Sequence, residues 1–158
     1  MNQLSNCTIL LVDDSKTNID VLVQALKNDY KLGVALEGEK AIEYAHIHSP
    51  DLILLDILMP GMDGFEVCRE IKKDPDTKDI PIIFITAVDD TGHKTKGFEY
   101  GAVDYITKPF DITEVKARVK THLTLKIAQA ALINQNAILE EKVLERTIEL
   151  KKTQLEII

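Results

Sequence analysis

The sequence contains only two cysteines, Cys7 and Cys68, which lie far apart and lack the Cys-x-x-Cys spacing of metal ligands. They are too few for a disulfide scaffold or a zinc site. The sequence also lacks an apolar run near the roughly 20 residues that a membrane-spanning helix needs, and residues 1–5 do not resemble a secretion signal. We therefore expect a protein of the reducing cytoplasm without a membrane partner.

An excess of positive charge is also absent. The 158 residues include 19 Lys and Arg against 26 Asp and Glu, which gives a net charge of −7. Because such a field repels phosphate backbones, nucleic acid is not an expected partner. A hydrophobic content of 45% and a charged content of 28% are typical of a globular protein, and the length allows one domain plus an appendage.

Glycine and proline are missing from the C-terminal part of the chain. The last glycine is Gly101 and the last proline is Pro109, so the remainder predicts one long helix. Asp111 and Glu114 have the spacing of a capping box at its start. The first turns of this helix should bury three apolar residues: Ile112, Val115 and Val119.

Five short apolar runs precede this helix, separated by amphipathic stretches. The runs are residues 8–12, 32–36, 52–55, 80–85 and 103–106. Continuous rather than alternating hydrophobicity indicates strands that are buried on both faces. Strands that alternate with helices are typical of an α/β protein with a parallel sheet and right-handed crossovers.

Polar side chains follow four of these runs: Asp13 and Asp14 the first, Asp56 the third, Thr86 the fourth and Lys108 the fifth. Ligands of such sheets bind beyond the carboxyl ends of the strands, so we expect these side chains to share one crevice. Three carboxylates in contact repel one another unless a cation is present, and Mg²⁺ suits carboxylate and phosphate oxygens best. A lysine and a hydroxyl complete the groups that phosphoryl transfer requires.

Each of these residues has an ordinary interpretation when it is considered alone. Asp14 and Ser15 could cap a helix, Thr86 could be a plain strand residue, and Lys108 could be solvated. Chance placement of the whole set at four strand ends in this order is improbable. The combination therefore favours a functional site.

The sequence resembles the receiver domain of two-component response regulators over roughly residues 6–122. The resemblance rests on four segments: Ile9–Asp14, Leu54–Gly64, Ile85–Ala87 and Gly101–Phe110. It implies a flavodoxin-like, doubly wound five-stranded parallel sheet ordered 2-1-3-4-5, here with an extended C-terminal helix. It also implies that Asp56 accepts a phosphoryl group from a histidine of a sensor kinase or phosphotransfer protein.

The same resemblance implies a Mg²⁺ site and a switch. In the family, the residue at Asp14 binds Mg²⁺ directly and the residue at Asp13 binds it mostly through water. Asp56 and the backbone carbonyl of Leu58 complete the protein ligands.

Thr86 and Lys108 would contact the phosphoryl oxygens, and their movement would draw Tyr105 inward. The Lys108-Pro109 bond is usually cis in the family.

Leu58 and Val88 should flank the phosphoryl group, and neither can hydrogen-bond an attacking water. We therefore expect a long-lived aspartyl phosphate.

The C-terminal stretch carries a modest coiled-coil seam that favours a parallel homodimer, although the helix could instead pack on another neighbour. The seam residues are Ile127, Ala130, Asn134, Ala137, Glu141, Leu144, Ile148, Lys151, Leu155 and Ile158. We divide the chain into a receiver domain, 1–122, and a helical linker, 123–158, which ends without a capping residue and therefore looks truncated before an output domain. Residues 119–123 and 139–147 resemble connectors that often precede an HD-GYP cyclic-di-GMP phosphodiesterase, or less often a cyclase or kinase module.

A receiver would be no enzyme beyond its own phosphoryl transfer and slow dephosphorylation. Three other functions are alternatives to this interpretation. A Mg²⁺-dependent phosphohydrolase needs a second acid two residues after its nucleophile, where Leu58 stands, and usually a cap domain. A flavodoxin-like cofactor binder would place Asp13 and Asp14 against a phosphate, which they repel. A constitutive dimerisation scaffold would leave the acidic crevice unexplained.

Overall fold

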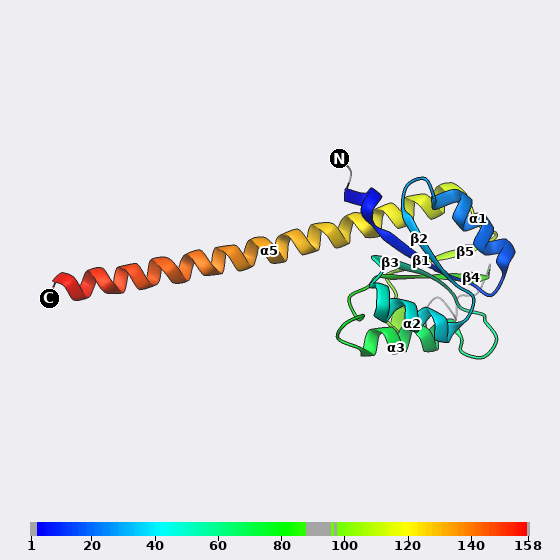
Figure 1. Cartoon of the computed structure of the whole chain (residues 1–158), viewed down its shortest axis with the longest axis horizontal. Helices are drawn as coiled ribbons and strands as arrows, with labels where there is room; N and C mark the ends of the chain where they lie inside the picture. Colours follow the sequence, from blue (N-terminus) through cyan, green and yellow to red (C-terminus); the bar gives the residue numbers. More distant parts are fainter. Residues whose placement is uncertain (1–2, 88–95, 97, 158) are drawn as a thin grey trace. The chain divides into compact units, whose positions relative to one another are not determined.

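The computed structural model describes residues 3–87, 96 and 98–157, and the chain divides into two compact units, Met1–Thr124 and Leu125–Ile158. The first unit is an α/β domain built on one parallel sheet (Figure 1). The strands are β1 (Thr8–Val12), β2 (Lys31–Ala35), β3 (Leu52–Asp56), β4 (Ile82–Ala87) and β5 (Asp104–Lys108). The helical segments are η1 (Gln3–Asn6), α1 (Lys16–Leu26), α2 (Gly38–His48), α3 (Gly64–Lys73) and α5 (Ile112–Ile157). The strand order is β2-β1-β3-β4-β5, which confirms the expected fold class.

The central strands form the core because their side chains are apolar on both faces. In β1, β3 and β4, alternate residues such as Leu10, Ile53 and Phe84 pack in one cluster with apolar residues of α2 and α3. The intervening residues are also fully buried, and Figure 1 shows α1 and the beginning of α5 on the other side of the sheet. Two helical layers therefore cover the sheet, as continuous apolar runs require.

The prediction that every strand is buried on both faces was wrong for the strands at the two edges of the sheet. In β2 the burial alternates, and the Val34 side chain is 45% exposed. In β5 only Ile106 is fully buried. Both strands are outermost in the sheet, where the helical layers cover less surface.

Strands β4 and β5 begin and end later in the sequence than expected, so that they include the polar residues that were expected to follow them. Strand β4 begins at Ile82, because Pro81 lacks the N–H of a ladder residue and contributes only its carbonyl, which accepts from Ile53 N at 3.0 Å. Its last residues pair with the end of β5, Thr86 with Thr107 and Ala87 with Lys108. The polar residues at 56, 86 and 108 are thus held by the ladder itself.

Side chains cap the starts of α1 and α3, α2 begins without a side-chain cap, and two expectations differ at α5. Asp111 accepts from the backbone N–H of Thr113 at 2.9 Å, as a helix cap does. Glu114 does not complete the expected capping box, because its carboxylate instead accepts from Arg118 Nε at 3.0 Å. Val115 and Val119 are buried as expected, whereas Ile112 is 36% exposed. Ile112 instead lines an open groove of about 480 Å³ beside α1, because the first turn of α5 lies at the margin of the sheet.

The second unit is the continuation of α5. Large apolar side chains are exposed along it, among them Leu132, Ile133, Val143 and Leu144. Among the described residues, no helix is both long enough and apolar enough to cross a bilayer.

Candidate functional site

Three carboxylates meet at the carboxyl ends of the central strands. Asp13 directly follows β1, and Asp56 is the last residue of β3. Ligand oxygens of Asp13, Asp14 and Asp56 all lie within 4.8 Å of one another. Asp13 and Asp56 are buried, while Asp14 is exposed at the mouth of the cluster. The structure therefore brings together three acids that lie at the ends of two different strands, Asp13 and Asp14 after β1 and Asp56 in β3.

Lys108 brings a positive charge to this cluster. Its Nζ lies 3.3 Å from Asp56 Oδ1 and 3.5 Å from Asp13 Oδ2. The lysine reaches both acids because it ends β5, on the same edge of the sheet. The peptide bond that follows, Lys108-Pro109, is cis, as the resemblance implied.

Asp13 is held in place by the first turn of α1. Its Oδ1 accepts from the backbone N–H of Ser15 at 2.9 Å, and its Oδ2 accepts from Asn18 Nδ2 at 3.2 Å. Ser15 also caps α1 by accepting from Asn18 N at 3.3 Å. The expected helix cap and the acidic site are thus one structure, in which capping fixes the orientation of a site carboxylate.

The electrostatics of the site act mainly on Asp56. Burial, followed by repulsion from Asp13, raises the pKa of the Asp56 carboxyl to about 6, and the nearby Lys108 only partly opposes this. A carboxylate whose charge is poorly compensated favours binding of an added cation. The arrangement can therefore hold a hard cation and present Asp56 as an oxygen nucleophile.

Thr86 lies on the strand between Asp56 and Lys108. It is buried, and its Oγ1 lies 3.5 Å from the Ala87 carbonyl oxygen, a long contact for a hydroxyl donor. Thr86 and Tyr105 line a crevice that has no room for a water molecule and that Phe98 and Ala102 also line. Thr86 thus lies on the strand next to Asp56 and shares a crevice with Tyr105.

The two residues expected to flank the phosphoryl group differ in what the structure describes. Leu58, two positions after Asp56, is 61% exposed. Val88 lies outside the described residues.

Gly64 fixes the backbone after Asp56. Its N–H donates to the Ile57 carbonyl at 2.9 Å. A Cβ at this position would overlap the Asp56 carbonyl oxygen and would lie 2.8 Å from Ile57 Cα. Only glycine allows α3 to begin this close to the loop that carries Leu58.

Sequence reasoning missed two groups of residues. Asn18 orients Asp13, and nothing in its spacing distinguishes it from an exposed helix residue. Asp104, Arg118 and His122 form a network between β5 and α5. The spacing of Glu114, Arg118 and His122 by four residues, one helix face, was the available signal.

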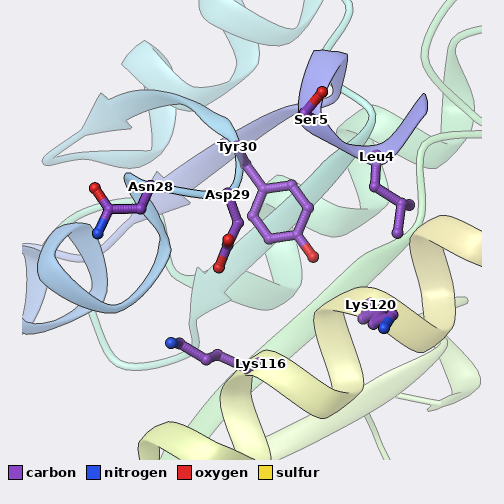
Figure 2. Close-up of a pocket in the computed structure, with 7 residues that line it drawn as sticks. All are labelled: Leu4, Ser5, Asn28, Asp29, Tyr30, Lys116 and Lys120. Atoms are coloured by element: carbon purple, nitrogen blue, oxygen red, sulfur yellow. The ribbon is translucent and has the colours of Figure 1, made fainter. Parts of the chain in front are cut away.

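A cavity of about 320 Å³ lies away from this chemistry, between the segments that precede β1 and β2 and the helix α5 (Figure 2). Its lining includes Ser5, Asp29, Tyr30 and two lysines, Lys116 and Lys120. Ser5, Asp29 and Tyr30 precede the amino ends of β1 and β2, so the cavity is separate from the acidic cluster at the carboxyl ends.

Comparison with known proteins gives a consistent result. Residues 9–120 match the response regulator receiver domain. A "Probable cyclic di-GMP phosphodiesterase" of Vibrio cholerae is 46% identical over 154 residues, 98% of this chain and 35% of that protein. "Response regulator PleD" of Caulobacter vibrioides is 44% identical over 120 residues, 75% of this chain and 26% of that protein. The chain thus spans about a third or less of these two relatives.

Among solved structures, a signal receiver domain of a histidine kinase from Syntrophus aciditrophicus superposes with a TM-score of 0.69 at 36% identity. The match covers 75% of this chain and 90% of that one.

Proposed function

Since the chain belongs to the response regulator receiver family, a family of signalling modules rather than catalytic enzymes, we propose that Asp56 is its phosphoacceptor. The phosphoryl donor is a histidine of a sensor kinase or of a phosphotransfer protein. The observation that carries the proposal is the position of Asp56 Oδ1, 3.3 Å from Lys108 Nζ within a cluster of three acids.

The proposed chemistry is one in-line displacement. An oxygen of the Asp56 carboxylate attacks phosphorus, a P–O bond forms, and the P–N bond of the phosphohistidine breaks as the imidazole leaves. Lys108 stabilises the charge on the phosphoryl oxygens, and Thr86 donates its hydroxyl to one of them. Lys108 is already held at the site by its contacts with Asp13 and Asp56.

The residues present fit a Mg²⁺ ion. Three carboxylates within 4.8 Å form the hard oxygen donor set that this ion prefers. Asp14, Asp56 and the Leu58 carbonyl would hold it directly, and Asp13 mostly through water. When bound, Mg²⁺ would neutralise charge on the acids and on the phosphoryl group.

Phosphorylation would then be sensed by Thr86 and Tyr105. The narrow crevice that both residues line supports this role, because a shift of Thr86 toward a phosphoryl oxygen changes the space beside the Tyr105 ring.

Intact-mass measurement after incubation with acetyl phosphate and Mg²⁺ tests the proposal. The protein should gain one phosphoryl group, and the Asp56→Asn variant should gain none. Gain by both would place the acceptor elsewhere, and gain by neither while Mg²⁺ binding is confirmed would favour a constitutive scaffold.

The proposal extends to residues 123–158 as a helical coiled-coil linker that follows a receiver domain of residues 1–122. The exposed apolar side chains of α5 support association with a second copy, because a lone helix rarely exposes so many. Leu144 and Ile148 lie in the expected seam, whereas Leu132, Ile133 and Val143, also exposed, lie outside it.

Sedimentation equilibrium tests the homodimer. The protein should be dimeric, and a Leu144→Asp, Ile148→Asp double variant should be monomeric. A monomeric parent would favour another partner for the helix.

The output of the relay is proposed from the extent of the sequence matches. The match to the Vibrio cholerae relative covers 98% of the chain, linker included, and that relative is named a cyclic di-GMP phosphodiesterase. Acetyl phosphate should therefore change the rate of cyclic-di-GMP hydrolysis by the protein made from the complete reading frame. We also propose a cytoplasmic location, which the two buried cysteine thiols, outside any disulfide, support.

A further inference from the structure

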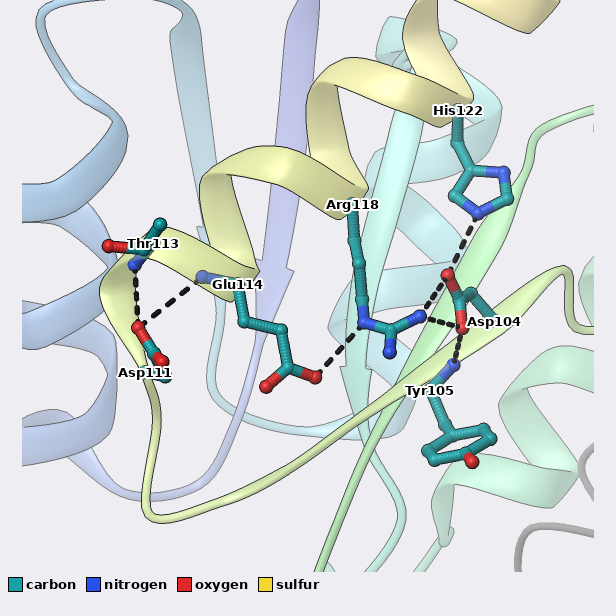
Figure 3. Close-up of polar contacts among 7 residues, drawn as sticks. All are labelled: Asp104, Tyr105, Asp111, Thr113, Glu114, Arg118 and His122. Carbon is teal, nitrogen blue, oxygen red and sulfur yellow. Dashed lines mark hydrogen bonds and ion pairs between the residues drawn. The ribbon is translucent and has the colours of Figure 1, made fainter.

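The carboxylate of Asp104 gathers contacts from two elements of the first unit (Figure 3). Arg118 Nη1 donates to both of its oxygens, at 2.6 Å and 2.7 Å, and His122 Nε2 lies 3.0 Å from Oδ2. The backbone N–H of Tyr105 donates to Oδ1 at 2.9 Å. Asp104 therefore joins β5 to two successive turns of α5.

Arg118 is held from three sides. Its Nε donates to Glu114 Oε1 at 3.0 Å, and its guanidinium carbon lies 5.8 Å from the centroid of the Tyr105 ring. A guanidinium at this distance from an aromatic ring is attracted to its face. The same arginine thus contacts the first residue of β5 and the side chain of the second.

The position of this network along the chain gives it a route to the acidic cluster. Strand β5 begins at Asp104 and ends at Lys108, which contacts Asp56. Helix α5 continues from Arg118 as one helix to Ile157. A change at Lys108 therefore acts on a strand whose other end, at Asp104, is bonded to the helix that leads into the linker, and a change at Tyr105 acts on the residue next to Asp104.

We infer that Asp104 and Arg118 are positioning residues that transmit the state of Asp56 from β5 to α5. The inference rests on the proposed function and extends it, because it names the contacts through which the helix senses phosphorylation. Movement of the Tyr105 ring removes one side of the Arg118 environment and so changes the hold of Asp104 on the helix. Neither residue touches the phosphoryl group.

The test compares amide hydrogen exchange in residues 112–150 with and without acetyl phosphate and Mg²⁺, while phosphoryl occupancy is read by intact mass. The variants are Asp104→Asn and Arg118→Met, with Arg118→Lys as the conservative replacement. Lys116→Met is the matched control, because Lys116 lies on the same helix and makes no ion pair among the described residues. Thermal unfolding verifies that each variant is folded.

In the parent and in Lys116→Met, phosphorylation should change exchange along α5. In Asp104→Asn and Arg118→Met, phosphoryl occupancy should be retained. The change in amide exchange per phosphoryl group should fall at least about threefold, as expected for groups in direct contact. Arg118→Lys should recover part of it.

An equal response in all folded variants would overturn the inference and leave the phosphoacceptor proposal intact. Absence of phosphoryl gain in the parent would instead remove the proposed function, and the inference with it. If Arg118→Met does not fold, the comparison of Asp104→Asn and Arg118→Lys with the parent decides the question.

Discussion

Asp56 and Asp104 are both carboxylates on strands of one sheet, each beside a cationic side chain, yet their pKa values move in opposite directions. Burial would raise both. At Asp56, repulsion from Asp13 adds to burial and the pKa rises to about 6. At Asp104, hydrogen bonds from Arg118, His122 and Tyr105 outweigh burial and hold the pKa below its usual value.

The difference lies in the number of fixed donors. Asp104 has side-chain and backbone donors at 3.0 Å or less, so its charge is satisfied within the protein. Asp56 has a lysine at 3.3 Å and another acid beside it, so its charge is satisfied only when something else binds. One site stabilises the fold, and the other keeps a charge available for ligand and phosphoryl group.

Removal of the cation at Asp104 should have the largest effect on stability. Arg118→Met would leave a mostly buried carboxylate without its main donor, and we expect a loss of about 2–3 kcal/mol in the free energy of unfolding, below the value for a fully buried pair because Arg118 is partly exposed. Urea unfolding at neutral pH measures it. Lys116→Met should stay within about 0.5 kcal/mol of the parent; equal losses in the two variants would show that the network adds nothing.

Neutralisation of Asp56 should change the free energy of unfolding in the opposite direction. Without Mg²⁺, Asp56→Asn removes a repelled, buried charge and should stabilise the protein by about 1–3 kcal/mol at pH 7, given the shift of its pKa. Added Mg²⁺ should stabilise the parent more than the variant. Destabilisation by Asp56→Asn in the absence of Mg²⁺ would mean that Lys108 already compensates Asp56 fully.

The pH dependence of these two variants separates the sites further. Because the pKa of folded Asp56 lies near 6 and that of an unfolded Asp near 4, the parent binds the extra proton only when folded, and its stability falls as pH rises through this window. The gain from Asp56→Asn should therefore be absent below about pH 4 and complete above about pH 6. Asp104 has a lowered pKa, so the loss from Arg118→Met should be complete above about pH 4 and should shrink at lower pH. Unfolding curves measured across this pH range give the stability of each variant relative to the parent. Parallel pH profiles for the two variants would contradict the assignment.

The smallest effect is expected beside Asp56, on the lifetime of the phosphoryl group. Leu58→Asn or Val88→Glu would place a polar group where it can hydrogen-bond an attacking water, and we expect dephosphorylation to accelerate about two- to tenfold. Decay of the phosphorylated protein, followed by intact mass after removal of acetyl phosphate, measures the rate. Leu58→Met is the matched control and should decay as the parent does; unchanged decay in both polar variants would remove the explanation.

The acidic cluster was accessible from sequence and the Asp104 network was not, for a physical reason. Asp13, Asp56 and Lys108 each stand at the end of an apolar run, and parallel strands bring such ends to one edge. The four-residue spacing of Arg118 and His122 places them on one helix face, but it does not show that this face lies beside β5, where Arg118 meets Asp104.

The same distinction explains the errors in burial. Continuous apolar runs correctly identified the strands, but they do not reveal which strand is outermost, so Val34 was expected to be buried and is 45% exposed. Ile112 was misjudged because helical periodicity does not show where the helix leaves the sheet.

Chemical location of the phosphoryl group is the most direct test of the contrast between the carboxylates. After phosphorylation with acetyl phosphate and Mg²⁺, borohydride reduces an aspartyl phosphate to homoserine, and peptide mass spectrometry shows which residue has changed. We predict homoserine at position 56 alone. Homoserine at position 13 or 14, or at position 104, would contradict the assignment of Asp56 as the available carboxylate.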